Sequence, residues 1–228
     1  MKNKHYFLSL FLLTSFLFSF YSCIDKKQHT TSLPALNDSI LSTKLLNSER
    51  TKIKFGSYGI DVLRQNSKLR VSNLYSIHGN KNITRTFAVV QYPDTINKAF
   101  LKEHTEILKG GSIGKVFKQN HWNIEKKSFY FGEISPSAAY EKLYALMGDI
   151  SPCKLAIYTY GFNIKKDTNS YLYATISEVY QPDYLTLNDL RKMNPDANKY
   201  LNETAFIKTL NLVKNEMTVN YHKLETVH

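Results

Sequence analysis

The segment Gly110-Gly111-Ser112-Ile113-Gly114 has the residue pattern in this sequence that is best suited to covalent chemistry. A Gly-x-Ser-x-Gly pattern supports nucleophilic catalysis when its serine lies on a tight strand-to-helix turn, beside backbone N–H donors. Here the preceding residues predict a helix instead of a strand. Glycines that end that helix, and a Ser112 that begins the next one, explain the same residues without catalysis.

A catalytic Ser112 would need a base, and the candidates are His121, His222 and His228, with an aspartate that the sequence does not identify. His104 lies on an apolar helical stripe, so we expect a hydrogen-bonded histidine at the edge of the core. No two histidines have metal-ligand spacing on one helix face. We therefore expect no metal and no other cofactor.

Glu178 is the carboxylate whose position is most informative. It shares one face of a predicted strand with apolar residues, namely Leu172, Ala174, Ile176 and Tyr180. If that face is buried, the carboxylate needs a partner or a raised pKa. A paired Glu178 is the expected outcome, and a catalytic acid is the alternative.

Tyrosine is the strongest local bias of the chain, at Tyr158, Tyr160, Tyr171, Tyr173, Tyr180 and Tyr184. Tyrosines on an exposed sheet face beside lysines would suit stacking on sugar rings or contact with another protein. Cross-strand pairing that only stabilises a hairpin is the favoured alternative. The candidate binding residues are Tyr158, Tyr160, Tyr171 and Tyr173.

Apolar periodicity predicts the elements that must position these side chains. The expected strands cover residues 53–62, 69–75, 83–92, 122–134, 155–164 and 171–180. The expected helices cover residues 95–109, 112–120, 137–147 and a C-terminal stretch that follows a capping-box pattern from Thr186 to Asp189. This order predicts a single α+β domain with an antiparallel meander, a tyrosine-rich hairpin, and interspersed and C-terminal helices.

The first residues have the layout of an export signal. The basic start Met1-Lys2-Asn3-Lys4 is followed by a largely apolar run from Tyr6 to Tyr21, which is shorter than the roughly 20 residues of a membrane-spanning helix. Bulky Phe20 and Tyr21 make ordinary signal cleavage after Ser22 unfavourable.

The segment Phe20-Tyr21-Ser22-Cys23 resembles the cleavage site of bacterial lipoprotein signals, in which a Leu-like residue and two mostly small residues precede a cysteine. It matches at Ser22 and Cys23 and departs at Tyr21. The resemblance implies that residues 1–22 are removed and that Cys23 is lipidated and anchors the chain to a membrane. A plain secreted protein or a signal anchor is the alternative, and a disulfide between Cys23 and Cys153 would then be open to the chain.

The resemblance also sets the expected organisation: a lipidated polar tether over residues 23–50, a domain over 51–220 and a tail over 221–228. Cys153 is expected to be a small buried hydrophobe. Loss of Lys2 and Lys4 leaves 28 of the 30 Lys and Arg residues against 19 Asp and Glu, a formal charge of +9. Such a surface favours anionic partners, whereas an envelope location disfavours nucleic acid.

These observations predict a lipoprotein of the bacterial cell envelope that faces the periplasm. The leading hypothesis is a non-enzymatic module that binds a protein or an anionic glycan. The alternative hypothesis is a lipid-anchored serine hydrolase that uses Ser112.

Overall fold

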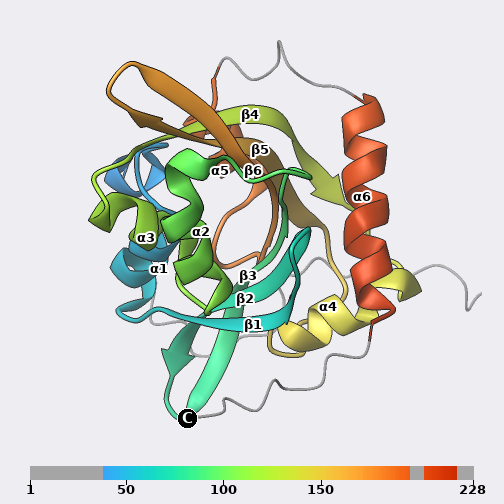
Figure 1. The fold of residues 1–228 in the computed structure, drawn as a ribbon. Coiled ribbons are helices and arrows are strands. Elements are labelled where there is room, and N and C mark those ends of the chain that lie inside the picture. Colours follow the sequence, from blue (N-terminus) through green and yellow to red (C-terminus); the bar gives the residue numbers. More distant parts are fainter. Residues whose placement is uncertain (1–37, 196–202, 220–228) are drawn as a thin grey trace, which may run out of the picture. The chain divides into compact units, whose positions relative to one another are not determined.

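The computed structural model describes residues 38–195 and 203–219. These residues form one α+β domain around a single antiparallel sheet with the strand order β1-β2-β3-β6-β5-β4 (Figure 1). The strands are β1 (Gly59–Gln65), β2 (Leu69–His78), β3 (Lys81–Gln91), β4 (Asn123–Ile134), β5 (Leu155–Lys166) and β6 (Asn169–Tyr180). Two three-stranded meanders, β1–β3 and β4–β6, therefore join along β3 and β6. The predicted fold class is confirmed.

Helices cover both faces of the sheet. The helical elements are η1 (Asp38–Leu41), α1 (Asn47–Phe55), η2 (Lys98–Phe100), α2 (Leu101–Leu108), α3 (Ile113–Gln119), η3 (Ala138–Tyr140), α4 (Glu141–Leu146), α5 (Leu187–Met193) and α6 (Glu203–Met217). Helices α1, α2, α3 and α5 pack on one face, and η3, α4 and α6 pack on the other (Figure 1). The domain thus has three layers, helix, sheet and helix.

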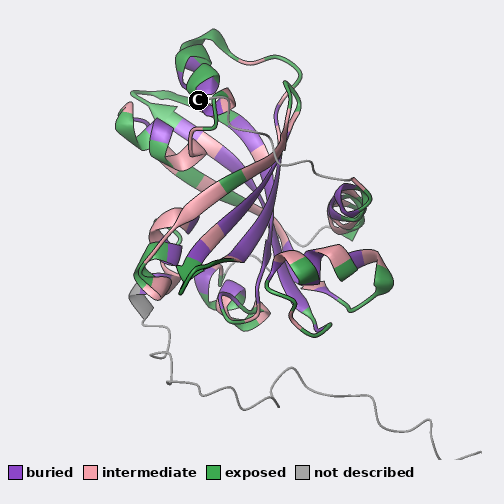
Figure 2. Ribbon diagram, turned by 90° about the horizontal axis from the view of Figure 1, so that it is seen from below, coloured by how far each residue is buried: buried purple, intermediate pink, exposed green. Residues whose placement is uncertain are grey.

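Covering both faces divides the interior into two cores. The first is aromatic and centres on Phe117 and Tyr173, under α2 and α3, whereas the second is mostly aliphatic and contains Phe87 and Val179. Alternate residues of a strand point to opposite faces, so both faces of the central strands are buried, and polar residues on them, such as Thr86 and Glu178, need partners. Figure 2 shows the result, with the central strands buried along most of their length.

The N-terminal part of the domain differs from the sequence prediction. Residues 47–55 form α1, so the strand expected over residues 53–62 is wrong in its first part, and β1 begins only at Gly59. The glycine at position 56 ends α1 in the left-handed conformation, with φ of 76° and an N–H bonded to the Lys52 carbonyl. Ile53 is exposed on this helix, which explains why its apolar character was misleading.

The tether expected over residues 23–50 is also too long. Ile40 and Leu46 are buried, and the Arg50 side chain is buried with its guanidinium bonded to the carbonyls of Ile40 and Ser42 at 2.8 and 2.9 Å. These contacts make residues 40–50 part of the domain. The lipidation site Cys23 lies outside the described residues.

Most other expected elements are confirmed, with boundaries that differ by a few residues. Gly110 has φ of 98° after α2, as a helix-terminating glycine should. Thr186 begins α5 with the predicted capping box, in which its side chain and that of Asp189 bond each other's backbone N–H groups. Among the described residues, no helix is long and apolar enough to cross a membrane.

Candidate functional site

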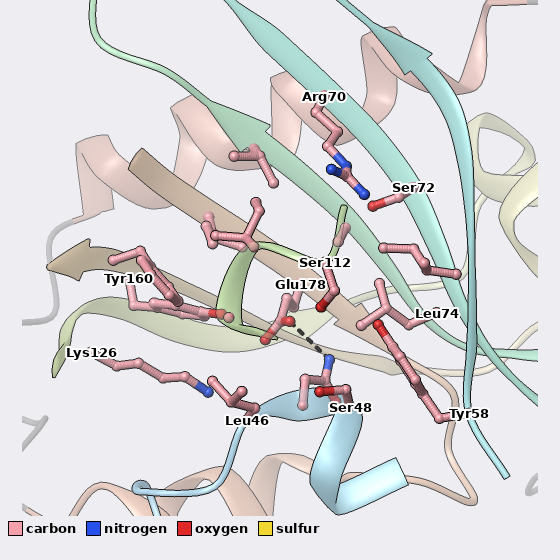
Figure 3. Close-up of a pocket in the computed structure, with 18 residues that line it drawn as sticks. Leu46, Ser48, Tyr58, Arg70, Ser72, Leu74, Ser112, Lys126, Tyr160 and Glu178 are labelled. Atoms are coloured by element: carbon pink, nitrogen blue, oxygen red, sulfur yellow. Dashed lines mark hydrogen bonds between the residues drawn. The ribbon is translucent and has the colours of Figure 1, made fainter. Parts of the chain in front are cut away.

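A small cavity lies between the sheet and the helical layer that contains α1 and α3 (Figure 3). Its volume is about 70 Å³, which is room for a few water molecules or one small polar group. All six strands contribute to its floor, through Ile60, Arg70, Ser72, Leu74, Ala88, Val90, Lys126, Tyr160, Phe162, Ile176 and Glu178.

The sheet register explains why these side chains meet. Arg70, Val90, Ile176 and Tyr160 are successive cross-strand partners, and the neighbouring row contains Ser72, Ala88, Glu178 and Tyr158. Cross-strand partners point to the same face of the sheet. Because Ser72 and Ala88 are small, the space above them stays open.

The roof of the cavity comes from three segments that are far apart in the sequence. Leu46, Asn47 and Ser48 begin α1, Tyr58 precedes β1, and residues 112–114 begin α3. A Cβ atom on Gly114 would lie 2.6 Å from the Leu46 side chain, so a larger residue at position 114 would force Leu46 to move.

Arg70 is the cavity residue whose charge lacks a partner. Its side chain is 1% exposed, and Nη1 donates to the carbonyls of Ile107 and Gly111 at 3.1 and 2.8 Å. Nη2 makes no hydrogen bond of ordinary geometry, although the Tyr92 hydroxyl is close enough to favour the charged guanidinium. No carboxylate of the described residues forms an ion pair with Arg70. Burial lowers its pKa, but an arginine remains charged at neutral pH.

Glu178, by contrast, is buried with its partners in place. Its two carboxylate oxygens accept hydrogen bonds from Asn47 Nδ2 at 2.8 Å and from the Tyr180 hydroxyl at 2.6 Å (Figure 3 draws the first). The Asn47 amide also donates to Thr86 Oγ1 at 3.1 Å, so this network fastens the start of α1 to the sheet. The expectation that a buried Glu178 would be paired is confirmed.

Lys126 supplies a second cation at the side of the cavity near Leu46 and Tyr160 (Figure 3). Its ammonium donates to the Leu45 carbonyl at 3.3 Å and lies 5.2 Å from the centre of the Tyr160 ring. Desolvation lowers the pKa of Lys126 to about 8, although the charge of Glu178 favours the protonated form. Burial, reinforced by the same carboxylate, raises the pKa of Tyr160 well above its usual value.

The lowered pKa of Lys126 predicts how stability depends on pH. The folded chain releases this proton near pH 8, whereas the unfolded chain keeps it up to about pH 10.5, so raising the pH through this window favours the folded state. We expect wild type to gain about 2 kcal/mol relative to Lys126→Met across the window, which allows for partial solvent screening. Urea unfolding at a series of pH values, followed by the fluorescence of the single tryptophan, Trp122, measures the difference. Parallel pH curves for the two proteins would contradict it.

Ser112 occupies the predicted N-cap position of α3 but makes no side-chain capping hydrogen bond. Its hydroxyl lines the cavity near the Tyr58 hydroxyl (Figure 3). Burial raises the pKa of Tyr58, and the Ser112 hydroxyl opposes that rise. The helical environment of the motif is as expected, since α2 precedes it and α3 follows it.

The structure separates Ser112 from the described candidate base. His121 is exposed beyond the opposite end of α3, nine residues from Ser112. No histidine is among the described residues that line the cavity. His222 and His228 lie outside the described residues.

His104 is buried elsewhere in the first core. Its Nδ1 lies 2.9 Å from the Tyr173 hydroxyl, and burial lowers its pKa. A hydrogen-bonded histidine at this position was expected and is confirmed. Among the described residues, no group of three His, Cys, Asp or Glu side chains is arranged to hold a metal ion.

The candidate exposed tyrosine surface, which was the less favoured interpretation, is contradicted by burial. Tyr158, Tyr160 and Tyr173 are 3%, 2% and 0% exposed, because the layer of α2, α3 and α5 covers the face to which they point. Tyr171 is half-buried against Phe100 and Trp122. Of the four candidates, only Tyr160 lines the cavity.

Cys153 is buried in the second core, as expected for a small hydrophobic residue. Its backbone carbonyl accepts a hydrogen bond from the Tyr144 hydroxyl at 2.8 Å.

A larger hollow of about 490 Å³ lies along α6 and Gln91. Its described lining residues are exposed or half-buried, and one of them, Lys208, is charged. A surface groove of this kind does not gather buried polar groups. The cavity beside Arg70 is therefore the stronger candidate site.

Sequence patterns did not single out Arg70, Asn47, Tyr58 or Lys126. Each is one polar residue within an ordinary stretch, and they meet only through the register of the strands and the packing of α1 and Tyr58 over the sheet. The signal that could have found Arg70 was strand alternation, which places it on the same strand face as the apolar Leu74.

No protein-family model matches the sequence, and no curated protein is significantly similar to it.

Proposed function

We propose that this chain is a cell-envelope lipoprotein whose domain is a non-enzymatic binding module, with the cavity as its binding site. One observation carries the proposal: all six strands direct side chains into one small cavity, where a buried cation has no acidic partner among the residues that the structure describes. A convergence of polar groups in a concave, otherwise apolar site is typical of ligand-binding pockets.

The anchor is the second part of the proposal. Residues 1–22 act as the export signal, Cys23 carries the lipid, and residues 24–37 connect it to the domain, which faces the periplasm. The partner is then a protein or an anionic glycan of the envelope that places a small polar group in the cavity. The positive charge of the mature chain supports an anionic partner.

Filling the cavity tests this proposal. In Ala88→Leu a larger side chain occupies the space between Ser72 and Glu178, so we expect loss of a small molecule that is retained by wild type. The lipidated protein is purified from membranes, and bound molecules are identified by native mass spectrometry and after denaturation. Ala145→Leu, an exposed position on α4 at the opposite face, is the matched control and should behave as wild type. Equal ligand recovery from all three proteins would show that the cavity is not the binding site.

A lipid-anchored serine hydrolase is the competing proposal. Its support is that the Ser112 hydroxyl faces the cavity and does not cap α3. It receives less support than binding because no described residue that lines the cavity is a histidine that could serve as a base.

A further inference from the structure

We propose that the cavity recognises a carboxylate, whose negative charge pairs with the guanidinium of Arg70. This inference rests on the proposed binding function and names the chemical class of the ligand. The group that enters is a monoanion at the end of a small molecule, a glycan or a protein side chain.

The balance of charge around the cavity is the first reason. Glu178 has Lys126 as a neighbouring cation and accepts hydrogen bonds from two donors, so its negative charge and both carboxylate oxygens already have partners. Within the described part of the chain, the electrostatic neighbours of Arg70 are the phenol groups of Tyr58, Tyr92 and Tyr173. The charged residues that line the cavity therefore sum to one unbalanced positive charge. A buried cation without an anion is unfavourable, and a bound carboxylate would remove that penalty.

The hydrogen-bond donors around the cavity are the second reason. Nη1 of Arg70 is already bonded to two carbonyls, whereas Nη2 has the Tyr92 hydroxyl nearby but makes no hydrogen bond of ordinary geometry. The hydroxyls of Ser72, Tyr58 and Ser112 line the same space. A guanidinium and several hydroxyls can satisfy two carboxylate oxygens. A phosphate dianion would bring more charge than the one unbalanced cation neutralises.

The size of the cavity is the third reason. About 70 Å³ admits a carboxylate and its adjoining carbon but not a whole sugar or nucleotide. Ligands larger than this would have to remain mainly outside the cavity. The cavity therefore selects the terminal group of the partner and does not select the rest of it.

Simple probes test the inference on the mature lipidated chain in detergent. Sodium acetate, acetamide and inorganic phosphate are added separately at matched ionic strength, and unfolding is followed by Trp122 fluorescence. A molecule that binds only the folded state raises the unfolding midpoint in a concentration-dependent way, which gives its dissociation constant. We expect acetate to stabilise the protein, and acetamide to bind at least roughly 10-fold more weakly.

Arginine variants locate the site of any acetate effect. Arg70→Met should weaken acetate binding roughly 10- to 100-fold, and Arg70→Lys should retain part of it. Arg85→Met is the matched control, because Arg85 is also buried, on the neighbouring strand, but does not line the cavity. If Arg70→Met does not fold, the comparison of acetate with acetamide in wild type and in Arg70→Lys still decides the matter.

The outcomes separate this inference from the proposed function. Equal stabilisation by acetamide and acetate, or tighter binding of phosphate than of acetate, would contradict carboxylate recognition but leave the cavity as a binding site. An equal effect of acetate on wild type and on Arg70→Met would also contradict the pairing of a carboxylate with Arg70. If no probe acts and yet a ligand is recovered from membrane-purified wild type, the carboxylate is wrong and the binding module stands. If no probe acts and no ligand is recovered, both proposals fail.

Discussion

Tyr173→Ala is expected to lower the free energy of unfolding by about 4 kcal/mol, the largest effect of any substitution considered for this chain. The Tyr173 side chain is completely buried, and its ring centre lies 4.6 Å from that of Phe117 and 5.6 Å from those of Phe100 and Tyr92. Truncation would remove these contacts and leave a void at the centre of the first core. Urea denaturation monitored by circular dichroism measures the loss.

Two neighbouring substitutions serve as controls for Tyr173→Ala. Tyr173→Phe removes the hydroxyl that lies 2.9 Å from His104 Nδ1 and also interacts with the Tyr92 hydroxyl, and it should cost about 1 kcal/mol. Tyr171→Ala truncates a half-buried ring of the same strand, so a smaller loss is expected. If Tyr173→Ala were as stable as wild type and instead lost a binding partner, Tyr173 would be a contact residue and the description of it as core would be wrong.

Glu178→Leu is expected to destabilise the domain by about 3 kcal/mol in the absence of ligand. The substitution introduces an apolar side chain of similar length, which leaves the Tyr180 hydroxyl without its acceptor and Asn47 Nδ2 with Thr86 Oγ1 alone. Buried donors that lose their partner cost about 1–3 kcal/mol each, whereas an apolar replacement recovers part of this. The measurement is again equilibrium unfolding in urea.

The control for Glu178→Leu is Glu133→Leu, because Glu133 makes a more exposed ion pair with Lys154 at 3.4 Å. Such pairs contribute up to about 1 kcal/mol, so the effect should be small. Similar losses in the two variants would show that the Glu178 network does not fasten α1 to the sheet.

The strands and the fold class could be predicted because periodicity is a local property. Residues 155–180 have the alternation and β-branched or aromatic content of a hairpin, and β5 and β6 appear there. Residues 47–55 were more difficult. The apolar Ile53 favoured a strand, but the residues at the two ends of the segment stabilise a helix. Glu49 accepts the Leu46 N–H at 2.7 Å, and the glycine at position 56 ends the helix.

The candidate site could not be predicted because it depends on long-range register. Glu178 was recognised as a polar residue on an apolar strand face, which is a local observation. That Asn47 is its partner depends on a contact across 131 residues. The exposed tyrosine surface failed for a similar reason, because strand alternation does not say that α2 and α3 will cover the face that bears Tyr173.

The most direct test of the binding cavity is a crystal structure of the mature protein purified from its own membranes. We expect density for a ligand in the cavity, with two oxygen atoms near Arg70 and one of them bonded to Nη2. A cavity filled only by ordered water that completes the hydrogen bonds of Arg70 would contradict the binding proposal, and would assign Arg70 the purely structural task of holding the carbonyls of Ile107 and Gly111.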